Sequence, residues 1–120
     1  MTPGVLRKNR RLRLSGGRSL RLLTAMEVIE ARREAEELVR EDREKALCSN
    51  ACLLARALER RGKPVFADGQ AVLDGLRAEE IGELARQWAR FNRRENPGTG
   101  WGVQAVEALK KVWSTHRKSV

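Results

Sequence analysis

The stretch RLRLSGGRSLRLLTAME, residues 11–27, decides the fold. Leucine alternates with arginine or serine on both sides of a turn formed by Ser15, Gly16 and Gly17. Leucines at every second position on both sides of a glycine turn predict a β-hairpin with one leucine face and one arginine face. Because an isolated hairpin is marginally stable in water, we expect the leucine face to pack on the helices that follow. The alternating leucines are Leu12, Leu14, Leu20 and Leu22.

The end of the same stretch predicts the start of a helix. Thr24 and Glu27 have the spacing of a capping box, in which the threonine hydroxyl accepts from the amide three residues on and the glutamate reaches back. No glycine or proline interrupts residues 24–61. We therefore expect either one long helix over these residues or two helices hinged near residues 42–45.

Glutamates spaced by three and four residues follow one edge of this helical segment, from Glu27 to Glu44. The arginine face of the hairpin matches this acidic edge, either in the same subunit or in a neighbouring one. Such pairs guide register and assembly more than stability, and salt screens them. These pairs form within the subunit or offer a salt-sensitive contact between copies, and the candidate residues are Arg11, Arg13, Arg18 and Arg21 with Glu30, Glu34, Glu37 and Glu41.

Breaks and apolar periodicity predict the remaining elements. Gly62-Lys63-Pro64 ends the first helical segment, and residues 96–100 form a second break. We expect a short extended piece at 65–66, a brief helix at 70–76, a firm helix at 78–92 and an amphipathic helix at 101–115. The predicted fold class is mainly α (α+β): a small helical domain with an N-terminal β-hairpin and an amphipathic C-terminal helix. The expected organisation is a flexible basic tail at 1–10, the hairpin and helical core at 11–97, and a linker with the C-terminal helix at 98–120.

Composition limits the function classes. The chain has 120 residues, 41% of them hydrophobic, which fits one small domain. Its net charge of +9 is concentrated at the ends: residues 1–22 carry seven basic side chains and no acidic one. A signal peptide and a membrane-spanning run are missing from the sequence, so we expect a soluble intracellular protein with no membrane partner.

The sequence offers little for catalysis. Cys48 and Cys52 lie four residues apart on one predicted helix face, and the single histidine, His116, is distant, so we interpret the cysteines as core residues and expect no metal site. Neither a nucleophile paired with a base nor a phosphate-cradling glycine loop is recognisable. We expect a protein that is not an enzyme and that needs no cofactor.

The sequence is compatible with two alternative binding functions. A pI near 10.7 and an arginine-rich start are the electrostatic footprint of a nucleic-acid-binding protein. Against it, every aromatic residue lies beyond residue 65, and the spacings of recognition helices and zinc fingers are missing. The other function is protein binding through the C-terminal helix, whose Trp101 and Trp113 are residue types that anchor interfaces. Its alternative is that this helix packs back on its own domain.

Three stretches carry a resemblance to a known family: LTAMEVIEARREAEELV, KALCSNACLLARALERRGKPVFADGQAVLDGL and IGELARQWARFNRRENPG. Together they resemble the small tail assembly chaperones of long-tailed, siphovirus-type phages and prophages, over roughly residues 11–113. The resemblance implies a mainly helical chaperone that coats the aggregation-prone tape measure protein while the tail tube polymerises. It implies a protein of the host cytoplasm that is not in the mature virion. The strongly basic start departs from the family pattern.

The resemblance also implies partners and a longer product. The expected partners are the tape measure protein, the tail tube protein and further copies of the chain; the alternative is a basic nucleic-acid-binding or packaging accessory protein of a phage or prophage. Many family members are also made in a longer form by a ribosomal frameshift. Leu109, Lys110 and Lys111 are compatible with a slippery codon sequence. A chaperone needs an apolar face for its client, and we nominate Trp88, Phe91, Trp101, Val106, Leu109 and Trp113.

Overall fold

The computed structural model describes residues 10–96. It confirms a mainly helical domain with an N-terminal hairpin. The predictions for the basic tail, the C-terminal helix and the frameshift position lie largely or wholly at residues 1–9 and 97–120, outside the described residues. The elements are β1 (Arg11–Arg13), a 3-10 turn (Ser15–Gly17), β2 (Arg18–Arg21), α2 (Ala25–Leu38), a 3-10 turn (Asp42–Glu44), α3 (Lys45–Ala57), β3 (Leu58–Arg60), β4 (Lys63–Pro64), α4 (Gly69–Gly75) and α5 (Ala78–Glu95).

The hairpin forms as the leucine alternation predicts. β1 and β2 are antiparallel, and Leu12 is the partner of Leu20. Gly16 and Gly17 have φ angles of 76° and 75°, a left-handed conformation that glycine adopts without steric cost. Leu20 is fully buried, so the leucine face does cover the helices.

The capping box is also confirmed. The Thr24 hydroxyl accepts a hydrogen bond from the Glu27 amide at 3.1 Å, and the Glu27 carboxylate accepts one from the Thr24 amide at 3.0 Å. α2 then ends at Leu38, because Val39 turns to extended backbone with a ψ of 129°. Residues 24–61 therefore contain two helices, and the hinge begins a few residues before the predicted position.

The helical prediction for residues 58–61 is wrong. α3 ends at Ala57, and Leu58–Arg60 forms β3, which pairs with β2 through Leu20 and Leu58. The pairing buries both leucines completely, an advantage that the local sequence does not reveal. β4 adds a further strand at Lys63–Pro64, earlier than the extended piece expected at 65–66, because the tight turn at residues 61–62 pairs Arg60 with Lys63. The result is a four-stranded sheet in the order β1-β2-β3-β4.

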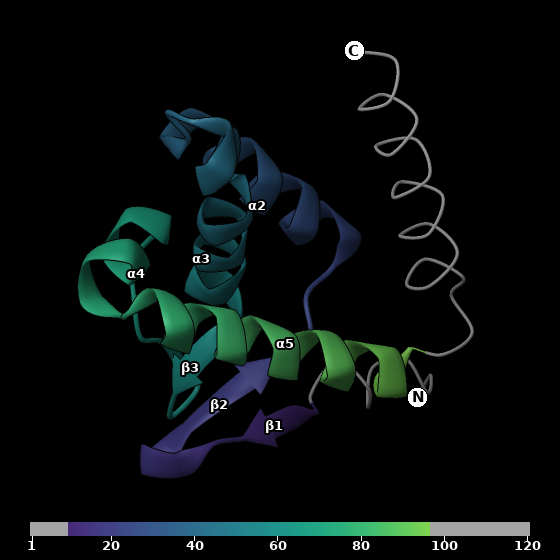
Figure 1. Cartoon of the computed structure of the whole chain (residues 1–120). Helices are drawn as coiled ribbons and strands as arrows, with labels where there is room; N and C mark the ends of the chain where they lie inside the picture. The colour runs from purple at the N-terminus through teal and green to yellow at the C-terminus, as the bar shows by residue number, and fades with distance from the viewer. Residues whose placement is uncertain (1–9, 97–120) are drawn as a thin grey trace.

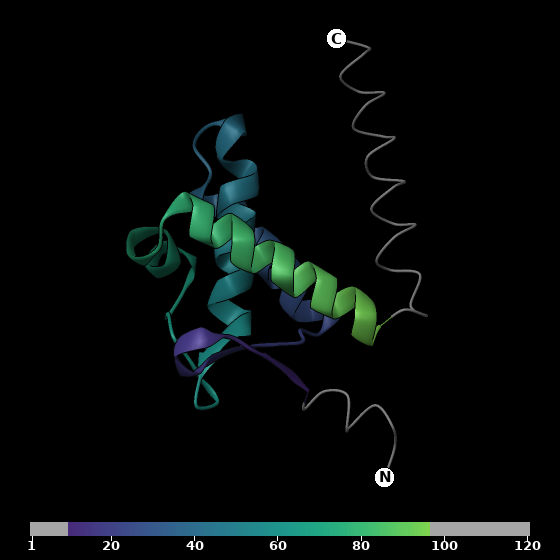
Figure 2. The same ribbon diagram turned by 60° about the horizontal axis from the view of Figure 1, so that its bottom comes forward.

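The helices surround α3, which contacts α2, α4 and α5. Figure 1 shows α5 crossing the molecule between the hairpin and the α2–α3 pair. Figure 2 shows α5 crossing over α3 from a second direction. No helix within residues 10–96 is long and apolar enough to cross a membrane.

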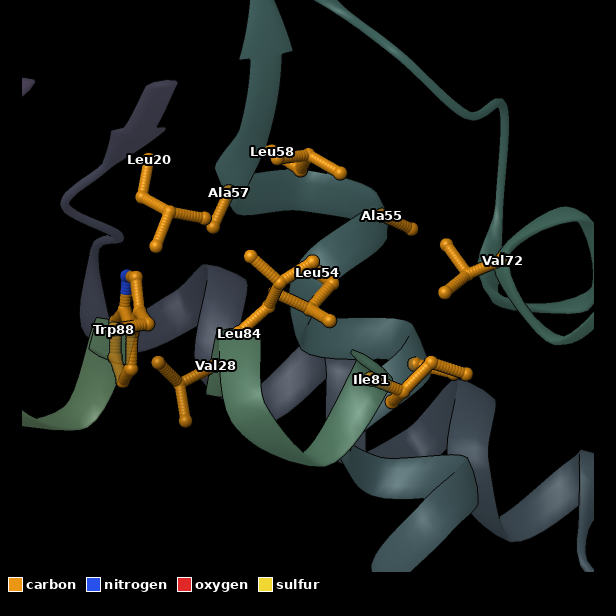
Figure 3. Close-up of a cluster of buried hydrophobic side chains, with 11 residues drawn as sticks. Leu20, Val28, Leu54, Ala55, Ala57, Leu58, Val72, Ile81, Leu84 and Trp88 are labelled. Atoms are coloured by element: carbon orange, nitrogen blue, oxygen red, sulfur yellow. The ribbon is translucent and has the colours of Figure 1, made fainter. Parts of the chain in front are cut away.

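The core lies where α3, α5 and the sheet meet. Trp88 of α5 lies between Leu20 of β2 and Val28 of α2 (Figure 3). The indole ring therefore joins the hairpin to α2. α5 buries the apolar face that its sequence predicts and extends to Glu95, beyond the predicted end at residue 92. Its buried residues are Ile81, Leu84, Trp88 and Phe91.

Candidate binding surfaces

A carboxylate joins three helices on one side of the domain. Glu34 of α2 accepts a hydrogen bond from the Gly69 amide at 2.7 Å and another from the Arg56 guanidinium at 2.6 Å. Arg56 also donates to the carbonyl of Cys52 at 3.0 Å. We call Glu34, Arg56 and Gly69 the Glu34 junction. Glu34, predicted to be a self-association residue, thus has both carboxylate oxygens engaged within its own chain.

The cysteines lie beside this junction as buried, free thiols, as the core interpretation expects. They pack on Ala31 and Ala35 of α2. Burial raises the pKa of both thiols, and burial together with the nearby Glu34 carboxylate raises the pKa of Cys52 to about 12. Cys52 therefore stays protonated at neutral pH, which is unfavourable for a nucleophile or a metal ligand. Within residues 10–96, no group of three or more His, Cys, Asp or Glu side chains is placed to hold a metal ion.

The arginine face of the hairpin meets acids of its own chain. Arg11 Nε donates to Glu59 Oε1 at 2.9 Å, and Arg21 Nη1 donates to Glu27 Oε1 at 3.1 Å. Glu59 is only 6% exposed, beneath these arginines. The hydrogen bond from Arg21 lowers the pKa of Glu27 and, reciprocally, raises the pKa of Arg21. Arg11 and Arg21 are thus held by acids from β3 and α2.

The predicted acidic edge does not run as one stripe. Glu30 and Glu37 are exposed on α2, but Glu41 lies beyond the helix end and pairs with Arg43 at 2.7 Å. Arg18 reaches a different acid, Glu80 of α5, at 3.7 Å. The edge is broken because α2 ends at residue 38.

An arginine-rimmed hollow lies between β1 and the last turns of α5. Its volume is about 540 Å³, and its lining residues are Leu12, Gln87, Arg90, Arg93 and Arg94. We call it the α5 hollow. Leu12 supplies an apolar wall, and the three arginines supply positive charge. The sequence shows arginines at the end of this helix, but their place next to β1 depends on the tertiary fold.

A second hollow of about 530 Å³ lies at the turn end of the sheet. We call it the turn hollow; it is lined by residues that include Arg11, Arg13, Arg18, Ser19, Arg61 and Gly62. Successive side chains of a strand point to opposite faces. β1 therefore contributes Leu12 to the α5 hollow from one face and Arg13 to the turn hollow from the other. Arg61 was missed by the sequence analysis because the turn containing it was not foreseen.

The nominated client-binding aromatics within the described residues are core residues. Trp88 is 7% exposed and Phe91 3% exposed, so neither presents a surface to a client. Trp88 Nε1 donates to the carbonyl of Arg21 at 2.9 Å, which ties α5 to the hairpin. The other nominated residues lie outside the described residues: Trp101, Val106, Leu109 and Trp113, together with Lys110 and Lys111 of the frameshift prediction.

Large exposed apolar side chains within residues 10–96 are Met26 and Ile29, both on α2. Their spacing of three places them on one helix face.

Comparisons with family models, with curated proteins and with solved structures found no match to the chain.

Proposed function

We propose that the chain is a non-enzymatic phage tail assembly chaperone that binds and solubilises the tape measure protein during tail morphogenesis. The resemblance supports it over residues that form α2 to α5. One structural observation carries the proposal: the α5 hollow adjoins the end of α5, shortly before the segment that contains Trp101, Leu109 and Trp113. The α5 hollow offers an amphipathic client helix a surface that is partly apolar and partly charged. The tryptophans that could anchor the client follow shortly after it in the sequence.

The lining of the α5 hollow defines the client's chemistry. Leu12 offers an apolar contact, and Arg90, Arg93 and Arg94 offer planar guanidinium groups that bind carboxylates in two-point contacts. A helix whose apolar stripe is bordered by Asp or Glu fits both features. Because Trp88 and Phe91 are buried, they support this surface and do not form it.

We further propose that several copies of the chaperone bind one client and that a longer frameshifted product is made, both active in the host cytoplasm and absent from the mature virion. Exposed Glu30 and Glu37 on α2 and the arginines of the α5 hollow are complementary charges for contacts between copies. Light scattering at low and high salt tests the association, and a salt-independent monomer would contradict it. Mass spectrometry of the products from the natural gene tests the frameshift at codons 109–111.

The main test is co-expression with the tape measure protein, encoded by the long helical reading frame expected near this gene. The measurement is the soluble fraction of the client. Arg90→Glu with Arg93→Glu, and separately Leu109→Asp with Trp113→Asp, should return the client to the insoluble fraction. The matched control is Arg32→Glu with Arg33→Glu on the exposed side of α2, which should leave the client soluble. An insoluble client beside the unaltered chain would refute the function, and equal losses in all variants would refute the site.

A further inference from the structure

The turn hollow brings two tight turns together at one end of the sheet. The β1–β2 turn contributes Gly17, and the β3–β4 turn contributes Arg61 and Gly62. Strand pairing places these turns side by side, because Arg18 at the start of β2 is the partner of Arg60 at the end of β3. The turn hollow is therefore built from segments more than forty residues apart in sequence.

Cations face cations at this end of the sheet. Arg60 is paired across strands with Arg18 on one side and with Lys63 on the other. Like charges directly opposite each other in a sheet are destabilising. Within residues 10–96, the ion pairs that form here leave Arg13, Arg60 and Arg61 without an acidic partner, and Arg18 reaches Glu80 only at 3.7 Å. Of these, Arg13 and Arg61 line the turn hollow, and an external anion is the group that would balance their charge.

Arg61 adds an independent observation. Its φ is 54°, and that of Gly62 is 79°, so both central residues of the turn are left-handed. Such hairpin turns favour asparagine, aspartate or glycine at the position that Arg61 occupies. An arginine there is strained, and strain of this kind is characteristic of functional positions. The strained backbone holds a guanidinium in the wall of the turn hollow.

The lining distinguishes a phosphate ligand from a protein ligand. Leu14 is the one apolar side chain among the described residues that line the turn hollow, and the others are arginines, glycines and Ser19. The centres of protein interfaces are depleted of charge and rich in apolar groups. Phosphate oxygens, in contrast, are bound by arginine, by serine hydroxyls and by backbone amides. We propose that the turn hollow binds the phosphodiester backbone of a nucleic acid, without reading its bases.

This activity is separate from the proposed chaperone function. The turn hollow and the α5 hollow receive side chains from opposite faces of β1, so a client in one leaves Arg13 and Arg61 accessible in the other. The nucleic-acid contact is therefore testable on the purified chain alone, with no tape measure protein present.

The experiment measures the affinity of the full chain for a short fluorescent DNA duplex by anisotropy, in salt from about 50 to 200 mM. The logarithm of the association constant should fall steeply and linearly with the logarithm of the salt concentration. Arg13→Gln with Arg61→Asn removes two phosphate contacts and should reduce the slope by about two, with binding at least about tenfold weaker at the lower salt. The control, Arg32→Gln with Arg33→Gln, removes the same charge from α2 and should keep the slope.

A stability measurement separates a binding role from a structural one. Arg61→Asn alone relieves the left-handed strain and should raise the melting temperature while it weakens DNA binding. Three results would overturn the proposal: no binding at low salt, an equal loss in the control variant, or displacement of DNA by a polyglutamate peptide at an equal concentration of charge. The last result would assign the turn hollow to an acidic protein.

Discussion

The Glu34 junction and the turn hollow both gather charged side chains, and they arrange them in opposite ways. In the junction, the carboxylate of Glu34 is half-buried and lies within 2.7 Å of a backbone donor and within 2.6 Å of a guanidinium. Beside the turn hollow, exposed Arg60 faces Arg18 and Lys63, and Arg13 and Arg61 of the hollow's lining have no acidic partner within residues 10–96. Folding accounts for the charges of the junction, because each one satisfies another polar group. It does not account in this way for Arg13 and Arg61 of the turn hollow, which is why we propose a ligand for that surface.

The largest effect expected from this comparison is at Gly69. A Cβ added there would lie 2.4 Å from Cys52 Sγ and 3.0 Å from a carboxylate oxygen of Glu34. Gly69→Ala should therefore lower the free energy of unfolding by about 2–3 kcal/mol, measured by urea denaturation. Gly82→Ala is the matched control, because its Cβ would meet only Arg86, at 3.6 Å, inside helix α5. That variant should gain about 0.5–1 kcal/mol. A Gly69→Ala variant as stable as the unaltered protein would show that the junction is loosely packed.

A smaller effect is expected when charge is removed from the Glu34 junction and from the strand end beside the turn hollow. Glu34→Gln weakens the hydrogen bond from Arg56, and should cost about 1–2 kcal/mol. Arg60→Gln removes a cation from between two others, and should change stability by less than about 0.5 kcal/mol or increase it. Urea denaturation under one set of conditions gives the free energy of unfolding of both variants for comparison. Equal losses would mean that the two regions do not differ in the way we describe.

The smallest effect concerns Glu27, which accepts hydrogen bonds from a hairpin arginine. The bond from Arg21 is the main reason why the pKa of Glu27 is below its ordinary value of 4.5. A carboxylate with a lowered folded pKa stabilises the fold above its unfolded pKa, and the contribution is lost as the pH falls below about 4.5 and through the folded pKa. The loss should be under about 1 kcal/mol, because the pair is partly exposed.

Thermal unfolding between neutral and acidic pH measures this dependence. Glu27→Gln retains the ability to complete the capping box and should show a flatter pH profile than the unaltered protein. Identical profiles would indicate that the contact between Arg21 and Glu27 contributes nothing at neutral pH.

Local signals in the sequence predicted much of the fold. Thr24 and Glu27 fix the start of α2 through contacts three residues apart, and Gly16 and Gly17 fix the hairpin turn. The apolar face of α5 was also predicted, from the spacing of its apolar residues. β3 was not, because Leu58–Arg60 continues an uninterrupted helical pattern, and only its pairing with β2 makes it a strand. Arg60 and Arg61 consequently appeared to be residues near the end of a helix.

The binding surfaces were harder to predict for the same reason. The expectation that the hairpin arginines meet protein acids holds for Arg11 and Arg21, but one of their partners, Glu59, comes from the unforeseen strand. The arginines at the end of α5 were visible in the sequence, yet their place around one hollow with Leu12 depends on how the helix crosses the sheet. Residues that are close only in the folded chain leave no periodic signal.

The position of the α2–α3 pair within the chain has a practical consequence. Both ends of this helical pair join neighbouring strands, β2 and β3, while its link at residues 39–44 lies at the opposite end of the molecule from the hairpin (Figure 1). Residues 40–43 of this link are exposed. Exposed loop tips accept inserted sequence most readily. A fluorophore or an affinity tag placed there would leave both hollows open, so binding at either hollow can be followed from a site remote from both.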